Sequence, residues 1–199
     1  TFILTVTDGA ECTQTVAFTD GNDIFAAYFP TSLAIGDINN DGDQDIAIMS
    51  EAFDAVSIML GDGTGAFTNA GDVGITFGAV AIDLADINND GKLDLIAATS
   101  GRLANRLGNG DGTFTNLPII NFTDSPDGLA VGDMNNDGKR DIVLTFAAPA
   151  KVIVLTGDGA GAFTVGPDVP VGSGPHDVVL ADVNSDGNTD VLSANGGSN

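Results

Sequence analysis

Short apolar runs alternate with polar segments rich in aspartate and glycine along the whole chain. No window sustains the 3.6-residue spacing that is typical of an amphipathic helix, so the pattern predicts short strands joined by turns. One apolar run precedes, and another follows, each of four aspartate-rich segments. The preceding runs are Leu33–Ile35, Ala81–Leu84, Leu129–Val131 and Val178–Leu180, and the following runs are Ile46–Met49, Leu95–Ala97, Ile142–Leu144 and Val191–Leu192.

The aspartate-rich segments recur at a nearly constant interval, since their first residues lie 49, 47 and 49 positions apart. In three copies a third apolar run, a glycine-rich turn and a phenylalanine follow (56–67, 103–114 and 152–163). Four strands in a repeat of about 48 residues is the size of one propeller blade. The sequence therefore predicts an all-β protein, a β-propeller with about four four-stranded blades. The expected repeats are 30–76, 77–123, 124–172 and 173–199.

The fourth repeat has only two of its four strands, whereas residues 1–29 contain two further strand-like runs, 2–6 and 14–18. Phe18 is expected at the position of the phenylalanine that follows each glycine-rich turn. We expect these N-terminal strands to complete the last blade, because an open strand edge recruits another strand. The pairing is possible in cis, or by strand exchange with a neighbouring chain, which builds rings or filaments.

Each aspartate-rich segment follows the pattern Asp-x-Asn-x-Asp-Gly-x-x-Asp. Oxygen side chains stand at positions 1, 3, 5 and 9, and glycine at position 6 allows the bend that curls the loop around one ion. Position 7 is Asp, Lys, Lys or Asn, so its backbone carbonyl is the expected ligand. Oxygen ligands without His or Cys favour Ca²⁺ over zinc or copper, and over Mg²⁺, which dehydrates reluctantly. The four predicted ligand sets are Asp37, Asn39, Asp41, Asp43 and Asp45; Asp86, Asn88, Asp90, Lys92 and Asp94; Asp133, Asn135, Asp137, Lys139 and Asp141; and Asp182, Asn184, Asp186, Asn188 and Asp190, with Asp43, Lys92, Lys139 and Asn188 contributing backbone carbonyls.

Position 2 of the loop is always apolar and is expected to point into the blade. These residues are Ile38, Ile87, Met134 and Val183. An EF-hand is excluded, because position 12 carries no glutamate and strands flank the loop in place of helices. The alternative is a set of aspartate-rich turns without metal, which the fourfold repetition in register disfavours.

The loop with its flanking strands, together with the Leu107–Phe114 segment, resembles the FG-GAP/VCBS repeat, and Phe77–Ala79 stands where the motif that names the family would begin. This resemblance implies the calcium-binding blades of integrin-α-like β-propellers and of many secreted bacterial proteins. It implies structural Ca²⁺ sites in the four loops. Members of that family usually have seven blades, whereas this chain has four loops.

Charge narrows the range of partners. The chain carries 28 acidic and 6 basic residues, a formal net charge of -22, which disfavours nucleic acid and anionic membrane surfaces. No apolar run approaches the roughly 18 residues of a membrane span. Extracellular calcium modules have dissociation constants of about 10⁻⁴–10⁻³ M, so such loops would fill outside the cell and stay empty in the cytosol. We expect an extracellular or cell-surface protein whose partner is a protein, a glycan or a copy of itself.

Catalysis is not expected. The single histidine, His176, and the single cysteine, Cys12, have no obvious partners, and Gly61–Ala66 resembles a nucleotide-binding glycine pattern but is followed by a strand-like segment. The alternatives are a calcium-dependent lectin, weakened by the absence of tryptophan, and a non-catalytic fragment of a larger propeller. Asn121 lies in an N-glycosylation sequon, which an exported chain could use.

Overall fold

The computed structural model describes residues 2–7, 13–18, 29–50, 54–75 and 78–197. These residues form antiparallel strands and turns without a helix, so the prediction of an all-β fold is confirmed. It follows that the described part holds no helix long and apolar enough to cross a membrane.

Four successive sheets occupy residues 30–195, and each begins with the strand that leads into an aspartate-rich loop. The first sheet contains β3 (Pro30–Gly36), β4 (Asp45–Ser50), β5 (Ala55–Gly61) and β6 (Phe67–Gly74). The second contains β7 (Ala79–Ala85), β8 (Asp94–Thr99), β9 (Arg102–Leu103), β10 (Arg106–Gly108), β11 (Phe114–Asn116) and β12 (Ile120–Asn121). The third contains β13 (Gly128–Gly132), β14 (Asp141–Ala147), β15 (Ala150–Gly157), β16 (Phe163–Val165) and β17 (Val169–Pro170), and the fourth contains β18 (Pro175–Ala181) and β19 (Asp190–Asn195).

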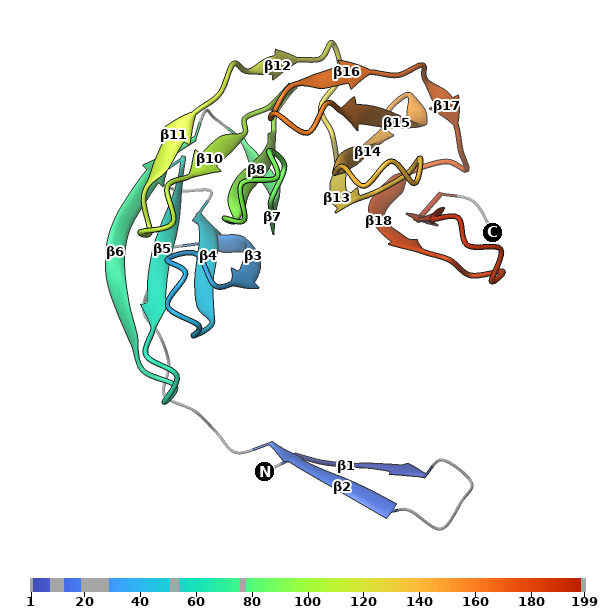
Figure 1. Cartoon of the computed structure of the whole chain (residues 1–199). Helices are drawn as coiled ribbons and strands as arrows, with labels where there is room; N and C mark the ends of the chain where they lie inside the picture. The colour runs from blue at the N-terminus through green and yellow to red at the C-terminus, as the bar shows by residue number, and fades with distance from the viewer. Residues whose placement is uncertain (1, 8–12, 19–28, 51–53, 76–77, 198–199) are drawn as a thin grey trace.

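The sheets follow one another around a common centre, as the blades of a propeller do (Figure 1). The first strands of neighbouring sheets contact one another, β3 with β7, β7 with β13 and β13 with β18. The arc is open between the first and the fourth sheet (Figure 1). Each sheet lies within one of the four expected repeats, and the described sheets do not close a ring.

Apolar side chains pack between neighbouring sheets and form three separate cores. Met49 and Leu95 belong to the first core, between the first and second sheets. Ile96 and Leu144 belong to the second, and Val178 joins the third and fourth sheets in the third core. Each sheet inside the arc therefore has a rear face, toward the sheet before it, and a forward face, toward the sheet after it.

The exposure of the side chain at loop position 2 depends on whether another sheet follows. Ile38 and Ile87 are each 1% exposed in the cores ahead of their sheets, and Met134 packs partly buried in the third core. Val183 is 61% exposed. The prediction that position 2 points into the protein is wrong for Val183, because among the described residues no sheet follows the fourth.

The N-terminal strands form a hairpin of their own. β1 (Phe2–Thr7) pairs with β2 (Thr13–Phe18), and neither is hydrogen-bonded to another described strand. The two predicted strands are thus present, while their pairing with the fourth sheet stays a prediction. Phe18 pairs with Phe2 at the far end of the hairpin, so its predicted position directly after the turn is wrong; Thr13 occupies that position.

Candidate metal centre: the four aspartate-rich loops

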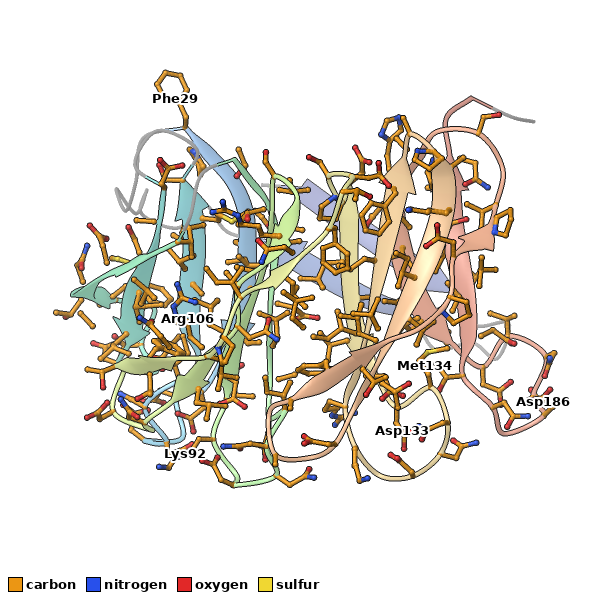
Figure 2. The ribbon with its side chains drawn as sticks, turned by 90° about the horizontal axis from the view of Figure 1, so that it is seen from above. Phe29, Lys92, Arg106, Asp133, Met134 and Asp186 are labelled. Atoms are coloured by element: carbon orange, nitrogen blue, oxygen red, sulfur yellow. The ribbon has the colours of Figure 1, made fainter. Side chains whose placement is uncertain are left out.

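The loops connect the first and second strands of each sheet and lie along one rim of the arc. Figure 2 shows Lys92, Asp133 and Asp186, from three different loops, on this rim, and Phe29 on the opposite rim. In each sheet the loop follows the first strand and lies at the same end, because the four sheets have the same strand order there. The predicted ligand sets are therefore brought to one side of the protein as four separate loops.

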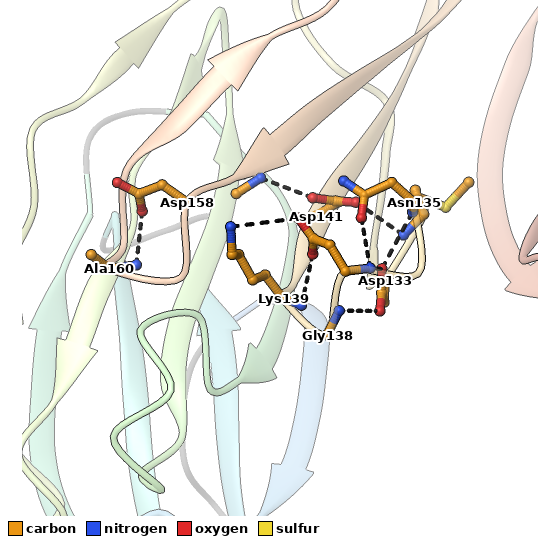
Figure 3. Close-up of polar contacts among 10 residues, drawn as sticks. Asp133, Asn135, Gly138, Lys139, Asp141, Asp158 and Ala160 are labelled. Atoms are coloured by element: carbon orange, nitrogen blue, oxygen red, sulfur yellow. Dashed lines mark hydrogen bonds and ion pairs between the residues drawn. The ribbon is translucent and has the colours of Figure 1, made fainter.

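Hydrogen bonds from the loop's own backbone hold the side chains of positions 1, 3 and 5. In the third loop, Asp133 Oδ2 accepts from the Gly138 amide at 2.8 Å, and Asn135 Oδ1 accepts from the Asp137 amide at 2.9 Å (Figure 3). Asp137 Oδ1 accepts from the Lys139 amide at 2.9 Å. The same three contacts recur in the other loops, within about 0.2 Å, so all four share one conformation.

Positions 4 and 6 of each loop have backbone angles that glycine and asparagine tolerate best. Position 4 has a positive φ in every loop, for example 59° at Asn40, and so does the glycine at position 6, for example 93° at Gly42. A left-handed conformation disfavours most side chains, which explains why Asn or Ser stands at position 4 and Gly at position 6. This bend turns the chain back so that the amides of positions 5 and 6 reach the carboxylate of position 1.

The aspartate at position 9 fastens the loop to the sheet. Asp141 is fully buried, and its two oxygens accept from the amides of Met134 at 2.9 Å and of Gly157 at 2.8 Å. The corresponding residues of the first two loops, Asp45 and Asp94, accept from the same two positions. Sequence analysis missed this role, although a glycine recurs at the end of each third strand.

These hydrogen bonds also change the pKa values of the loop aspartates. The Gly138 amide lowers the pKa of Asp133, and the Gly187 amide lowers the pKa of Asp182. The Asp43 amide likewise lowers the pKa of Asp41, so these exposed carboxylates are held ionised. Desolvation by burial raises the pKa of Asp94, and the nearby charges of its own loop add to the shift. The exposed part of the loop is thus a concentration of negative charge.

The donor set fits a hard cation in type, since each loop offers carboxylate, amide and carbonyl oxygens and neither His nor Cys. Among the described residues no group of three or more Asp, Glu, His or Cys side chains converges as on a metal ion. The physical reason lies in the loop, where positions 1 and 5 carry carboxylates, position 3 carries an amide, and position 9 turns to the backbone. A carboxylate oxygen has two lone pairs, so an N–H donor on it leaves one available to an ion.

The loops also contact the next sheet. Asn136 of the third loop donates from Nδ2 to the Gly187 carbonyl at 3.3 Å and to Asn188 Oδ1 at 3.1 Å in the fourth loop. The third and fourth loops are therefore in direct contact on this rim.

Residues outside the loops offer little chemistry. His176 is exposed on β18, Asn121 is exposed on β12 where a glycan would have access, and Cys12 lies outside the described residues. The structure reveals a buried lysine that sequence analysis did not single out: Lys151 Nζ bonds Asp124 at 2.8 Å and Asp168 at 3.1 Å. These ion pairs tie two turns to the third sheet.

The sequence matches the family model of the FG-GAP-like repeat over residues 37–97, 86–144 and 133–193. No curated protein sequence matches the chain. The fold is similar to BBS1N as crystallised in complex with ARL6DN and soaked with lead, with 14% identity and a TM-score of 0.63 over 85% of this chain and 51% of that chain. It is also similar to a protein from Lactobacillus plantarum, with 15% identity and a TM-score of 0.54 over 92% of this chain and 59% of that one. At these identities the likeness shows the fold alone, and the chain spans little more than half the length of either structure.

Proposed function

The chain belongs to the FG-GAP-like repeat family, and we propose that it is an exported β-propeller module that Ca²⁺ rigidifies, with a structural, adhesive or self-assembly role at the cell surface. The observation that carries this proposal is the fourfold repetition of one loop conformation with an all-oxygen donor set. In each loop the ion would be held by the side chains of positions 1, 3, 5 and 9 and by the carbonyl of position 7.

A bound ion would act mainly on stability. At about 1 mM Ca²⁺, a site with a dissociation constant of about 10⁻⁴–10⁻³ M contributes roughly 0.4–1.4 kcal/mol, so four sites contribute a few kcal/mol. Four ions would also change the formal charge from -22 to -14 by adding eight positive charges, which relieves repulsion along the rim. Because the third and fourth loops touch, bound ions there would stiffen the junction between the third and fourth sheets.

We also propose a non-catalytic role, which the same residues support. The loop carboxylates bond their own backbone, and the described residues outside the loops contain one histidine, which is exposed. The acidic surface suits a protein or glycan partner, or a copy of the chain, better than nucleic acid or an anionic membrane.

Thermal unfolding in millimolar Ca²⁺ and in chelator tests the proposal. We expect the midpoint to fall by about 5–20 °C in chelator, from the few kcal/mol of binding energy. Replacing Asp41 by Ala should remove part of this difference, because one loop of four is lost. As a matched control, replacing the exposed Asp168, which lies outside the loops, should leave the calcium-dependent difference unchanged. Identical midpoints with and without Ca²⁺ would refute the proposal.

A further inference from the structure

The first sheet exposes apolar side chains whose counterparts in later sheets of the chain are covered. Leu33 and Ile35 on β3 are 61% and 59% exposed. Ile82 and Val178 occupy the position of Leu33 in the second and fourth sheets, four residues before the loop, and are 7% and 4% exposed. The difference arises because, among the described residues, no sheet packs against the rear face of the first sheet.

The fourth sheet exposes apolar side chains on its forward face instead. Its forward face exposes Val179, Val183 and Leu192 by 57%, 61% and 40%. The first-sheet counterparts, listed in the same order, are covered by the second sheet at 8%, 1% and 0% exposure: Ala34, Ile38 and Ala47. A shallow hollow of about 220 Å³ lies over Val179 and Leu192.

The rear face of the first sheet and the forward face of the fourth correspond to the two faces that pack against each other inside the arc. Every core of the arc joins the forward face of one sheet to the rear face of the next. Only the rear face of the first sheet and the forward face of the fourth lack a partner among the described sheets. In one chain these faces lie at opposite ends of the open arc (Figure 1), so they cannot cover each other without a large rearrangement.

The N-terminal hairpin has the same connection length as the outer strand pairs of the first three sheets, and the described fourth sheet lacks such a pair. In the first three sheets a five-residue connection joins β5 to β6, β10 to β11 and β15 to β16, at 62–66, 109–113 and 158–162. β1 and β2 are likewise joined by five residues, 8–12. The chain then runs from the hairpin into β3, as it runs from β6 into β7.

The fourth sheet also lacks a hydrogen-bond donor that a third strand supplies. Asp190 Oδ2 accepts from the Val183 amide at 3.0 Å, as its counterparts do. The donor to the other oxygen, given by Gly61, Gly108 and Gly157 at 2.8 Å, has no equivalent in the described part of the fourth sheet. Thr7 of the hairpin stands at the corresponding register position, next to the five-residue connection.

We propose that a second copy of this chain covers these features, with the first sheet of one copy and its N-terminal hairpin docking on the fourth sheet of the other. The rear face around Leu33 would pack on the forward face around Val179, and β1 would pair with the free edge of β19. Two such head-to-tail junctions close a ring of two chains, because a heterologous interface that repeats once can close on itself. This proposal does not depend on calcium binding.

The mass of the full chain in solution, at about 0.15 M salt to screen the negative charge, is the first test. We expect twice the mass of one chain, in Ca²⁺ and in chelator alike. Leu33→Asp or Val179→Asp should each weaken the dimer by about 100-fold or more, because either places a charge in both junctions. Mixing the two variants should restore dimers, since one junction then joins two unaltered faces.

Val169→Asp is the matched control, because Val169 is 49% exposed but lies on β17, away from both end faces. It should leave the dimer intact, and circular dichroism should show that all three variants fold. A monomeric parent chain would overturn the proposal and indicate that the hairpin covers its own fourth sheet. A dimer that survives Val179→Asp, variants that do not complement each other, or filaments of growing mass would also overturn it.

Discussion

The third and fourth sheets carry the same loop but differ in what surrounds them. The two loops make the same internal contacts: the Asp137 and Asp186 amides both donate to position 1 at 3.2 Å. Around them, Val143 is fully buried in the third sheet, whereas its counterpart Leu192 in the fourth is 40% exposed. The loop conformation is therefore a local property of its nine residues, while burial is a property of the neighbouring sheet.

The largest expected difference between the two sheets concerns the aspartate at position 9. Asp141→Ala leaves one buried and one partly buried amide without an acceptor, at about 1–3 kcal/mol each, so we expect a loss of about 2–5 kcal/mol in the free energy of unfolding. Asp190→Ala removes one partly exposed contact and should cost about 1 kcal/mol. Denaturant unfolding in chelator measures both without a contribution from Ca²⁺.

Asp141→Asn serves as the control, because its side-chain oxygen keeps one acceptor and the loss should be intermediate. Equal losses for Asp141→Ala and Asp190→Ala, when both are measured in the Val179→Asp background that should be monomeric, would contradict the comparison. In the proposed dimer the cost of Asp190→Ala should rise toward that of Asp141→Ala, because the donated strand brings the missing donor.

A smaller effect concerns Asp83, which stands on β7 where the first and third sheets have Ala34 and Ala130. Burial between sheets raises the pKa of Asp83, with hydrogen bonds from the Leu84 and Val131 amides opposing the shift. A raised pKa in the folded state means that the folded protein holds the proton more tightly than the unfolded chain, whose pKa is about 3.9. Stability is therefore lost as the pH rises from about 4 through the folded-state pKa.

Asp83→Asn should remove this loss. Relative to the parent, the variant should gain about 1 kcal/mol or less between pH 3 and pH 7, as measured by denaturant unfolding. Asp83→Ala, which reproduces the residue of the neighbouring sheets, should show the same trend with a constant offset. A stability difference independent of pH would show that the buried carboxyl is not the cause.

Much of this architecture could be predicted from the sequence, because it depends on patterns of residues that are close together in the chain. The apolar runs around Asp37 and its counterparts gave the first and second strands, and the position of glycine gave the turns. The loop ligands could be selected from residue type and spacing alone. These features depend on residues close together in the chain.

Features that depend on distant residues could not be predicted in this way. The burial of Ile87 and the exposure of Val183 follow from whether another sheet is present, not from the loop that both share. The second hydrogen bond to Asp141 comes from Gly157, sixteen residues further along and on another strand. The place of Phe18 was mistaken because composition resembled the repeat while the register of β1 and β2 did not.

The number of Ca²⁺ ions bound per chain tests the central claim most directly, since the loops are the feature that all four sheets share. Calorimetric titration of the calcium-free protein should give about four ions per chain with dissociation constants of about 10⁻⁴–10⁻³ M. Asp186→Ala in the fourth loop should reduce this number by one. Binding of no Ca²⁺ at millimolar concentration would contradict the account, because the four loops would then be turns without a metal.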